Sequence, residues 1–123
     1  MTSDDVKLGS ATPIFRVPDL SQALEWYQSV LGFQIAWTWG EPADHASVCC
    51  DSAEINLVVE PGGQLTISRV YFETQGVDAY HDRVSRAGGQ VTVSLGDRSY
   101  GMRDFRIVDP AGNELSFGEP TSS

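Results

Sequence analysis

Basic residues are scarce in this sequence, which also lacks a long apolar run and a cysteine pair of disulfide or zinc-binding type. One lysine and seven arginines are outnumbered by 17 acidic residues, and the formal net charge is −9. Such a surface repels phosphate backbones and anionic lipids, so we expect neither nucleic acid nor membrane among the partners. The same charge attracts a cationic small molecule, although acidity also simply keeps a protein soluble.

No stretch approaches the roughly 18 apolar residues that a membrane-spanning helix needs. The first ten residues, "MTSDDVKLGS", contain no apolar signal core, so we expect a cytoplasmic protein. A chain of 123 residues is large enough to bury a core of its own, and we expect residues 1–123 to form one domain.

The two cysteines, Cys49 and Cys50, are adjacent in an expected strand. Their side chains therefore point to opposite faces, which makes them a poor intramolecular pair. With no CxxC and no Cys/His spacing of zinc type, we interpret them as reduced, small apolar residues.

The pattern of apolar residues predicts the same order of elements, strand, helix and three strands, twice along the chain. In the first module, about residues 12–60, we expect strands at 12–17, 33–39, 46–50 and 55–60, and a helix between Asp19 and Gly32. In the second, about residues 67–119, we expect strands at 68–74, 90–94, 104–108 and 114–119, and a helix from Val77 to Gly88. Turn formers fill "GEPADH" between two strands of the first module, and "PGGQLT", residues 61–66, is the expected hinge.

Both expected helices carry an apolar stripe at helical spacing. The first stripe consists of Leu20, Ala23, Leu24, Tyr27 and Leu31, and the second of Val77, Tyr80, Val84 and Ala87. Neither module has enough elements to close a core alone, so we expect the two to pack together and to pair with a second copy of the chain.

Two segments, "VPDLSQALEWYQSVLGF" and "YGMRDFRIVDPAGNELSF", carry a family resemblance. Their V-x-D-L, L-G-F and D-P-x-G-N patterns are similar to those of the glyoxalase/bleomycin-resistance/dioxygenase superfamily, also called vicinal-oxygen-chelate proteins. The resemblance spans about residues 12–119. It implies an α+β fold, with two βαβββ modules forming curved mixed sheets around a cavity, and a homodimer. In character the chain is closest to the bleomycin-resistance type of binding protein.

Enzymes of this superfamily hold a metal ion on the first and last strands of each module, usually through His or Glu. The resemblance places these four positions on Thr12, Asn56, Arg69 and Ser116. None is a metal ligand by preference, and an arginine opposes a divalent ion, so we expect no metal cofactor. If the register is shifted by two residues, Glu54, Glu73 and Glu114 could instead hold a hard divalent cation.

Alternation along the strands divides the side chains between two faces. Toward the helices we expect Phe15, Ile55, Leu57, Val70, Phe72, Leu115 and Phe117. Toward a ligand pocket we expect Thr12, Ile14, Asn56, Val58, Arg69, Tyr71 and Ser116. Trp37 and Trp39 share a face and form either core or an aromatic ledge, and Tyr100 could close the mouth of the same pocket. His45, in a loop, and His81, at a helix margin, are not at ligand positions.

These observations favour a metal-independent protein that sequesters an aromatic or cationic small molecule, as antibiotic-resistance members of the superfamily do. The alternative is a metal-dependent lyase, isomerase or dioxygenase acting on a substrate with vicinal oxygens. A third possibility is an enzyme without metal, in which Arg69 holds a substrate carboxylate and Glu73 or Tyr71 moves a proton.

Overall fold

The computed structural model describes residues 5–60 and 66–121 and contains the predicted βαβββ order twice. The first module consists of β1 (Ile14–Val17), α1 (Leu20–Ser29), β2 (Gln34–Gly40), β3 (Ala43–Cys50) and β4 (Ala53–Val59). The second consists of β5 (Arg69–Glu73), α2 (Val77–Arg86), β6 (Gln90–Asp97), β7 (Met102–Val108) and β8 (Glu114–Pro120). The expected hinge at 61–66 lies, apart from Thr66, outside the described residues.

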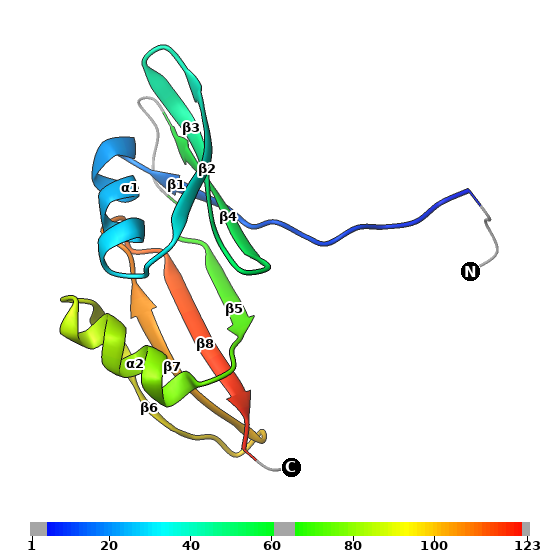
Figure 1. Ribbon diagram of the computed structural model, residues 1–123, viewed down its shortest axis with the longest axis vertical. Helices are drawn as coiled ribbons and strands as arrows, with labels where there is room; N and C mark the ends of the chain where they lie inside the picture. Colours follow the sequence, from blue (N-terminus) through cyan, green and yellow to red (C-terminus); the bar gives the residue numbers. More distant parts are fainter. Residues whose placement is uncertain (1–4, 61–65, 122–123) are drawn as a thin grey trace.

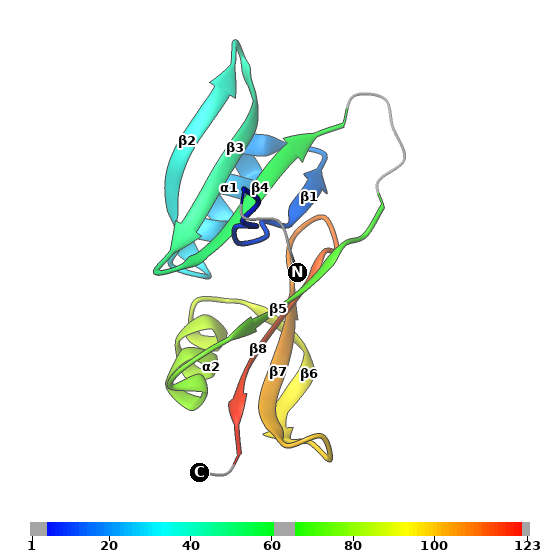
Figure 2. The same ribbon diagram turned by 90° about the vertical axis from the view of Figure 1, so that its right-hand side faces the viewer.

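Each module forms one four-stranded mixed sheet, with strand orders β1-β4-β3-β2 and β5-β8-β7-β6. The first strand of each module pairs in parallel with the last, and the other neighbours are antiparallel. The two sheets follow one another along the long axis, and both helices cover the same side of the molecule (Figures 1 and 2). The opposite face of each sheet, its open face, carries no helix. Within the described residues, no helix is long and apolar enough to span a membrane.

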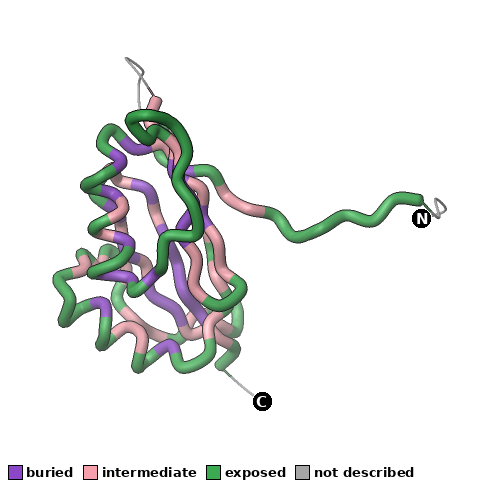
Figure 3. The backbone as a smooth tube through the Cα atoms, turned by 45° about the horizontal axis from the view of Figure 1, so that its top comes forward, coloured by how far each residue is buried: buried purple, intermediate pink, exposed green. Residues whose placement is uncertain are grey.

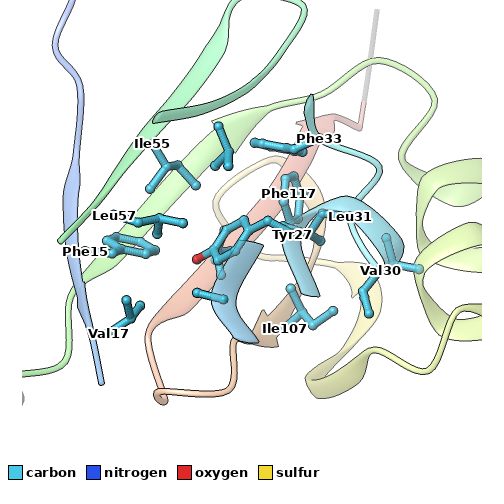
Figure 4. Packing of buried hydrophobic residues seen from close by; sticks show 14 of the residues in the cluster. Phe15, Val17, Tyr27, Val30, Leu31, Phe33, Ile55, Leu57, Ile107 and Phe117 are labelled. Atoms are coloured by element: carbon cyan, nitrogen blue, oxygen red, sulfur yellow. The ribbon is translucent and has the colours of Figure 1, made fainter. Parts of the chain in front are cut away.

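Alternation along the strands places side chains as predicted. The expected helix-facing residues Phe15, Ile55, Leu57, Leu115 and Phe117 are buried, and Val70 and Phe72 pack partly buried against the same core. Figure 3 shows this buried interior beneath the helices, together with the extended, exposed segment that precedes β1. The cluster contains residues of both modules, and Figure 4 shows Tyr27 of α1 together with Ile107 of β7 and Phe117 of β8.

The helix ends agree with the sequence signals. The Asp19 side chain accepts a hydrogen bond from the Gln22 backbone N–H (3.0 Å) and caps α1. Gly76 caps α2 without a side chain, and Glu119 of β8 accepts from the Val77 N–H instead (2.6 Å). Gly88 follows α2 with φ +93°, a conformation that favours glycine.

Several predicted strand boundaries were wrong. Strand β4 begins at Ala53 rather than 55, β6 ends at Asp97 rather than 94, and β7 begins at Met102 rather than 104. The expected turn "GEPADH" shortens to Glu41 and Pro42, because β3 already begins at Ala43, so His45 lies on a strand rather than in a loop. The first strand begins at Ile14, two residues later than predicted, and leaves Thr12 ahead of the sheet. A polar composition indicated a loop at 43–45, but pairing with β2 satisfies that backbone.

The turn between β7 and β8 is held by the buried side chain of Asp109. Its Oδ1 accepts hydrogen bonds from the backbone N–H groups of Ala111 and Asn113, both at 2.9 Å. Asn113 in turn donates from Nδ2 to Asp109 Oδ2 (3.0 Å). The D-P-x-G-N pattern therefore forms a turn in which the side-chain carboxylate of the aspartate accepts hydrogen bonds from two backbone N–H groups.

The same turn connects the two modules. Tyr27 of α1 donates its hydroxyl to Asp109 Oδ2 (2.8 Å), and Asn113 donates to the carbonyl of Arg16 on β1 (3.1 Å). The Asn113 Oδ1 accepts from the N–H of Ser68, just before β5 (2.9 Å). Because Asp109 and Asn113 are almost fully buried, these bonds are shielded from water.

Replacing Tyr27 with Phe tests this connection. We expect Tyr27→Phe to lower the free energy of unfolding by about 2 kcal/mol, because it leaves a buried carboxylate short of a donor. Tyr80→Phe is the matched control: its hydroxyl also crosses between modules, to the Leu31 carbonyl (2.7 Å), but both partners are neutral and the expected loss is about 1 kcal/mol. Urea unfolding measures both, and a smaller loss for Tyr27→Phe would contradict the role of Asp109.

Candidate functional site

A cavity of about 250 Å³ opens on the open face of the second sheet. It is lined by Tyr71 of β5, Val93 of β6, Tyr100 of the β6–β7 loop, Asp104, Phe105 and Arg106 of β7, and Ser116 of β8. Strand register brings these residues together, because Ser116 pairs with Tyr71 on one side and with Arg106 on the other. The structure thus gathers three predicted pocket residues, Tyr71, Tyr100 and Ser116, around one cavity.

The buried carboxylate of Asp104 organises this cavity. Its Oδ2 accepts hydrogen bonds from the hydroxyls of Tyr71 (2.9 Å) and Tyr100 (2.7 Å), and its Oδ1 accepts from Arg98 Nε (2.7 Å). Arg98 Nη2 also donates to the Asp104 carbonyl (2.9 Å) and to the carbonyl of Ser94. Both carboxylate oxygens are therefore occupied by donors from the protein.

These contacts shift the pKa values of Asp104, Tyr71 and Tyr100. Burial acts to raise the pKa of Asp104, but the hydrogen bonds from Arg98, Tyr100 and Tyr71 together lower the pKa below its ordinary value. Burial, followed by the bond to Asp104, raises the pKa of Tyr71. The bond to Asp104, followed by burial, raises the pKa of Tyr100. At neutral pH both phenols are protonated donors, which makes Tyr71 a poor general base.

Gly118 of β8 makes the arrangement possible. It pairs with Asp104, and a Cβ at Gly118 would overlap the Tyr71 hydroxyl and lie 2.8 Å from Asp104 Cβ. The Tyr71 side chain therefore reaches Asp104 by crossing β8 at its one position without a side chain. Any larger residue at 118 would displace Tyr71 from the carboxylate.

Arg69 and Ser116, two of the four positions where the family resemblance predicted metal ligands, lie on this face in a network of charges next to the cavity. Arg69 Nε donates to Glu114 Oε1 at 2.6 Å. Arg106 approaches the same Glu114 oxygen at 3.8 Å and donates from Nε to Ser116 Oγ at 3.3 Å. Arg69 and Arg106 both carry a positive charge at this site, which opposes binding of a divalent cation.

The open face of the first sheet carries the two predicted tryptophans. Trp37 and Trp39 of β2, with Thr38 and His45, line a shallow hollow of about 500 Å³. The indoles are 43% and 68% exposed, so they form a ledge rather than core. The His45 ring contacts both indoles, with its centroid 6.5 Å from each. Within one chain this hollow is separate from the cavity at Tyr100, so the single pocket expected from the sequence is divided in two.

Three of the remaining predicted pocket residues, Ile14, Asn56 and Val58, lie on the same face of the first sheet. Ile14 pairs with Asn56, and Val58 pairs with His45. The Asn56 Oδ1 is buried and, among the described residues, has no hydrogen-bond partner. Thr12 is half-buried just ahead of β1.

The glutamates considered as substitute metal ligands lie apart in one chain. Glu54 is on the first sheet, where its Oε2 accepts from the Ser47 hydroxyl (2.6 Å), whereas Glu73 and Glu114 are at opposite ends of the β5–β8 pair. No group of three or more His, Cys, Asp or Glu suited to a metal ion occurs in residues 5–60 and 66–121. The prediction of a metal-free protein stays a prediction.

The sequence did not indicate a site role for Arg98, Asp104 or Arg106, nor for His45, which was expected in a loop. Alternation contained a signal for two of them, since Phe105 and Ile107 face the core and therefore turn Asp104 and Arg106 to the open face. Arg98 lies in the β6–β7 loop, where no alternation applies. His45 was missed with the early start of β3.

Fold and site together define a protein with two βαβββ modules and open, partly aromatic sheet faces. A family profile described as the Glyoxalase/Bleomycin resistance protein/Dioxygenase superfamily matches residues 7–117, and the chain belongs to this superfamily. No curated protein sequence matches the chain.

Solved structures of similar fold include TioX from Micromonospora sp. ML1, with 22% identity, a TM-score of 0.81, and 91% of this chain and 99% of that chain covered. A glyoxalase-related enzyme from Clostridium phytofermentans has 19% identity and a TM-score of 0.79, with coverages of 96% and 99%. Lactoylglutathione lyase from Agrobacterium tumefaciens has 21% identity and a TM-score of 0.74, with coverages of 92% and 96%. At these identities the likeness shows the fold alone.

Asp104→Asn tests the role of the buried carboxylate. At neutral pH we expect the variant to lose about 2 kcal/mol of unfolding free energy, because an amide cannot accept from all three donors. The pKa of Asp104 is lower in the folded than in the unfolded protein. The ionised carboxylate therefore stabilises the fold above the unfolded-state pKa, about 3.9, and this stabilisation is lost as the pH falls through the folded-state pKa. The difference between wild type and variant should therefore shrink below about pH 4.

Urea unfolding between pH 7 and pH 3 measures this difference. Asp82→Asn is the control, since Asp82 is exposed on α2 and paired with Arg86 (3.3 Å), and its loss should be under about 0.5 kcal/mol. A wild-type advantage over Asp104→Asn that stays constant with pH would show that the carboxylate charge is not what stabilises the site.

Proposed function

We propose that this protein binds a small planar aromatic molecule without a resident metal ion, as a sequestering rather than a catalytic member of its superfamily. The observation that carries the proposal is the exposed ledge of Trp37 and Trp39 on a sheet face that no helix covers. Paired indoles that remain exposed are suited to stacking on a flat ligand, and a cation over an indole gains about 0.5 to 2 kcal/mol. A role in antibiotic resistance and a cytoplasmic location belong to this proposal.

The chemistry of the superfamily metal positions supports binding without metal. Arg69 and Ser116 contact Glu114 and Arg106, so this end of the site is occupied by cationic groups and their partners. Tyr71, considered as a proton carrier in a metal-free enzyme, is held as a donor to Asp104. These contacts favour a role in binding over one in catalysis.

The tryptophan ledge is tested with proflavine, a planar cationic aromatic compound, added to chelator-treated protein. We expect the double variant Trp37→Ala, Trp39→Ala to bind about tenfold more weakly, because it loses both stacking surfaces. Fluorescence anisotropy of the dye measures the affinity. Trp26→Phe is the matched control, because Trp26 packs against Tyr27 on α1, away from the open face (centroids 4.9 Å apart). Unchanged affinity in a folded double variant would remove the ledge from the site.

The proposal includes a homodimer in which a second copy covers part of the open faces. The large apolar residues on or beside these faces are 43% exposed or more: Ile14, Trp37, Trp39, Ile67 and Tyr71. Such exposure is typical of an interface or a ligand site. We expect light scattering after size exclusion to give twice the 13.4 kDa chain mass at micromolar concentration. A monomer at that concentration would contradict the dimer but not the ledge.

A further inference from the structure

We propose that the cavity on the second sheet recognises an anionic group, a carboxylate on a planar aromatic compound, through Arg106 and Ser116. The inference rests on the proposed function, small-molecule binding at the open faces, and adds the chemistry of one end of the ligand. The overall charge of −9 suggests a cationic ligand instead. At this cavity, however, the local arrangement of ion pairs decides which charge is available to a ligand.

Asp104, which lines the cavity, and Glu114, which lies near Arg106, are each already paired with another arginine. Asp104 is 4% exposed, and its two oxygens accept from Arg98, Tyr71 and Tyr100. Glu114 accepts from Arg69 at 2.6 Å. A cationic ligand would have to displace Arg98 or a phenol to reach Asp104, and near Glu114 it would be repelled by Arg69 and Arg106, so the cavity disfavours it.

Arg106 is the cation that remains available. Its polar contacts with other described residues are long, 3.3 Å from Nε to Ser116 Oγ and 3.8 Å from Nη1 to Glu114 Oε1, and its side chain is 31% exposed. A planar guanidinium binds a carboxylate through two parallel hydrogen bonds. Ser116 is buried beside it, and while its oxygen accepts from Arg106 its hydroxyl proton can be donated to the same anion.

The walls of the cavity fit the rest of such a ligand. Tyr71 and Tyr100 are anchored at their hydroxyl ends by Asp104, so their rings are held in place before a ligand arrives. Val93 of β6 adds an apolar contact surface. A volume of about 250 Å³ is small for a ligand pocket and suits a compound of one or two rings.

The experiment compares three probes of one shape and different charge: naphthoate, its uncharged amide, and naphthylmethylammonium. Each is titrated to millimolar concentration at constant ionic strength. Backbone amide shifts of Phe105, Arg106 and Ser116 report the cavity, and the indole N–H shifts of Trp37 and Trp39 report the ledge. We expect naphthoate to shift the cavity amides and to bind there at least tenfold more tightly than the other two probes.

Arg106→Gln should abolish this preference, and Arg106→Lys, which keeps the charge but not the paired donors, should reduce it. Arg86→Gln is the control, because Arg86 is exposed on α2 and paired with Asp82. Equal or tighter cavity binding of the amide or the ammonium probe, or a preference for naphthoate that survives Arg106→Gln, would overturn the anion site alone. If none of the probes shifts either set of signals, the anion site and the proposed function fail together.

Discussion

The arrangement of the two modules depends on the hydrogen bonds to the buried carboxylate of Asp109. This carboxylate closes the turn between β7 and β8 and accepts from Tyr27 of α1, while its turn partner Asn113 bonds to Arg16 and Ser68. Strand β1, helix α1 and the residue before β5 are thus all bonded to one turn of five residues, 109–113. Since a buried charge is costly without partners, these bonds are favoured together or lost together, and the turn fixes how one sheet follows the other.

Asp104, five residues earlier in the chain, uses the same chemistry on the opposite face of the sheet. There the carboxylate accepts from two phenols and a guanidinium and faces a cavity rather than the core. One buried acid therefore joins the modules, and the other holds the rings of Tyr71 and Tyr100 in place. Side chains alternate between the two faces of a strand, and Asp104 and Asp109 are an odd number of residues apart. The two acids therefore lie on different sides of the sheet and have different roles.

The order of elements and the core could be predicted because both depend on local periodicity. Apolar residues at helical and strand spacing indicate α1, α2 and the inward faces of the strands whatever the rest of the chain does. The site depends instead on contacts between strands. Tyr71 can reach Asp104 because the neighbouring strand has a glycine at position 118. The spacing of residues within a single strand does not indicate such a contact between strands. His45 was missed for a related reason, since pairing with β2 overrode the loop-like composition around it.

Charge is distributed unevenly between the two open faces, and this bears on ligand choice more than the net charge does. The first face presents indoles and His45, which suit a flat ring of either neutral or positive charge. On the second, Asp104 is paired with Arg98 and Glu114 with Arg69, and among the described residues that line the cavity Arg106 is the arginine. A ligand that used both faces would need an extended aromatic system ending in an acid. Because the two hollows are separate within one chain, that ligand would also require a second chain to bring them together.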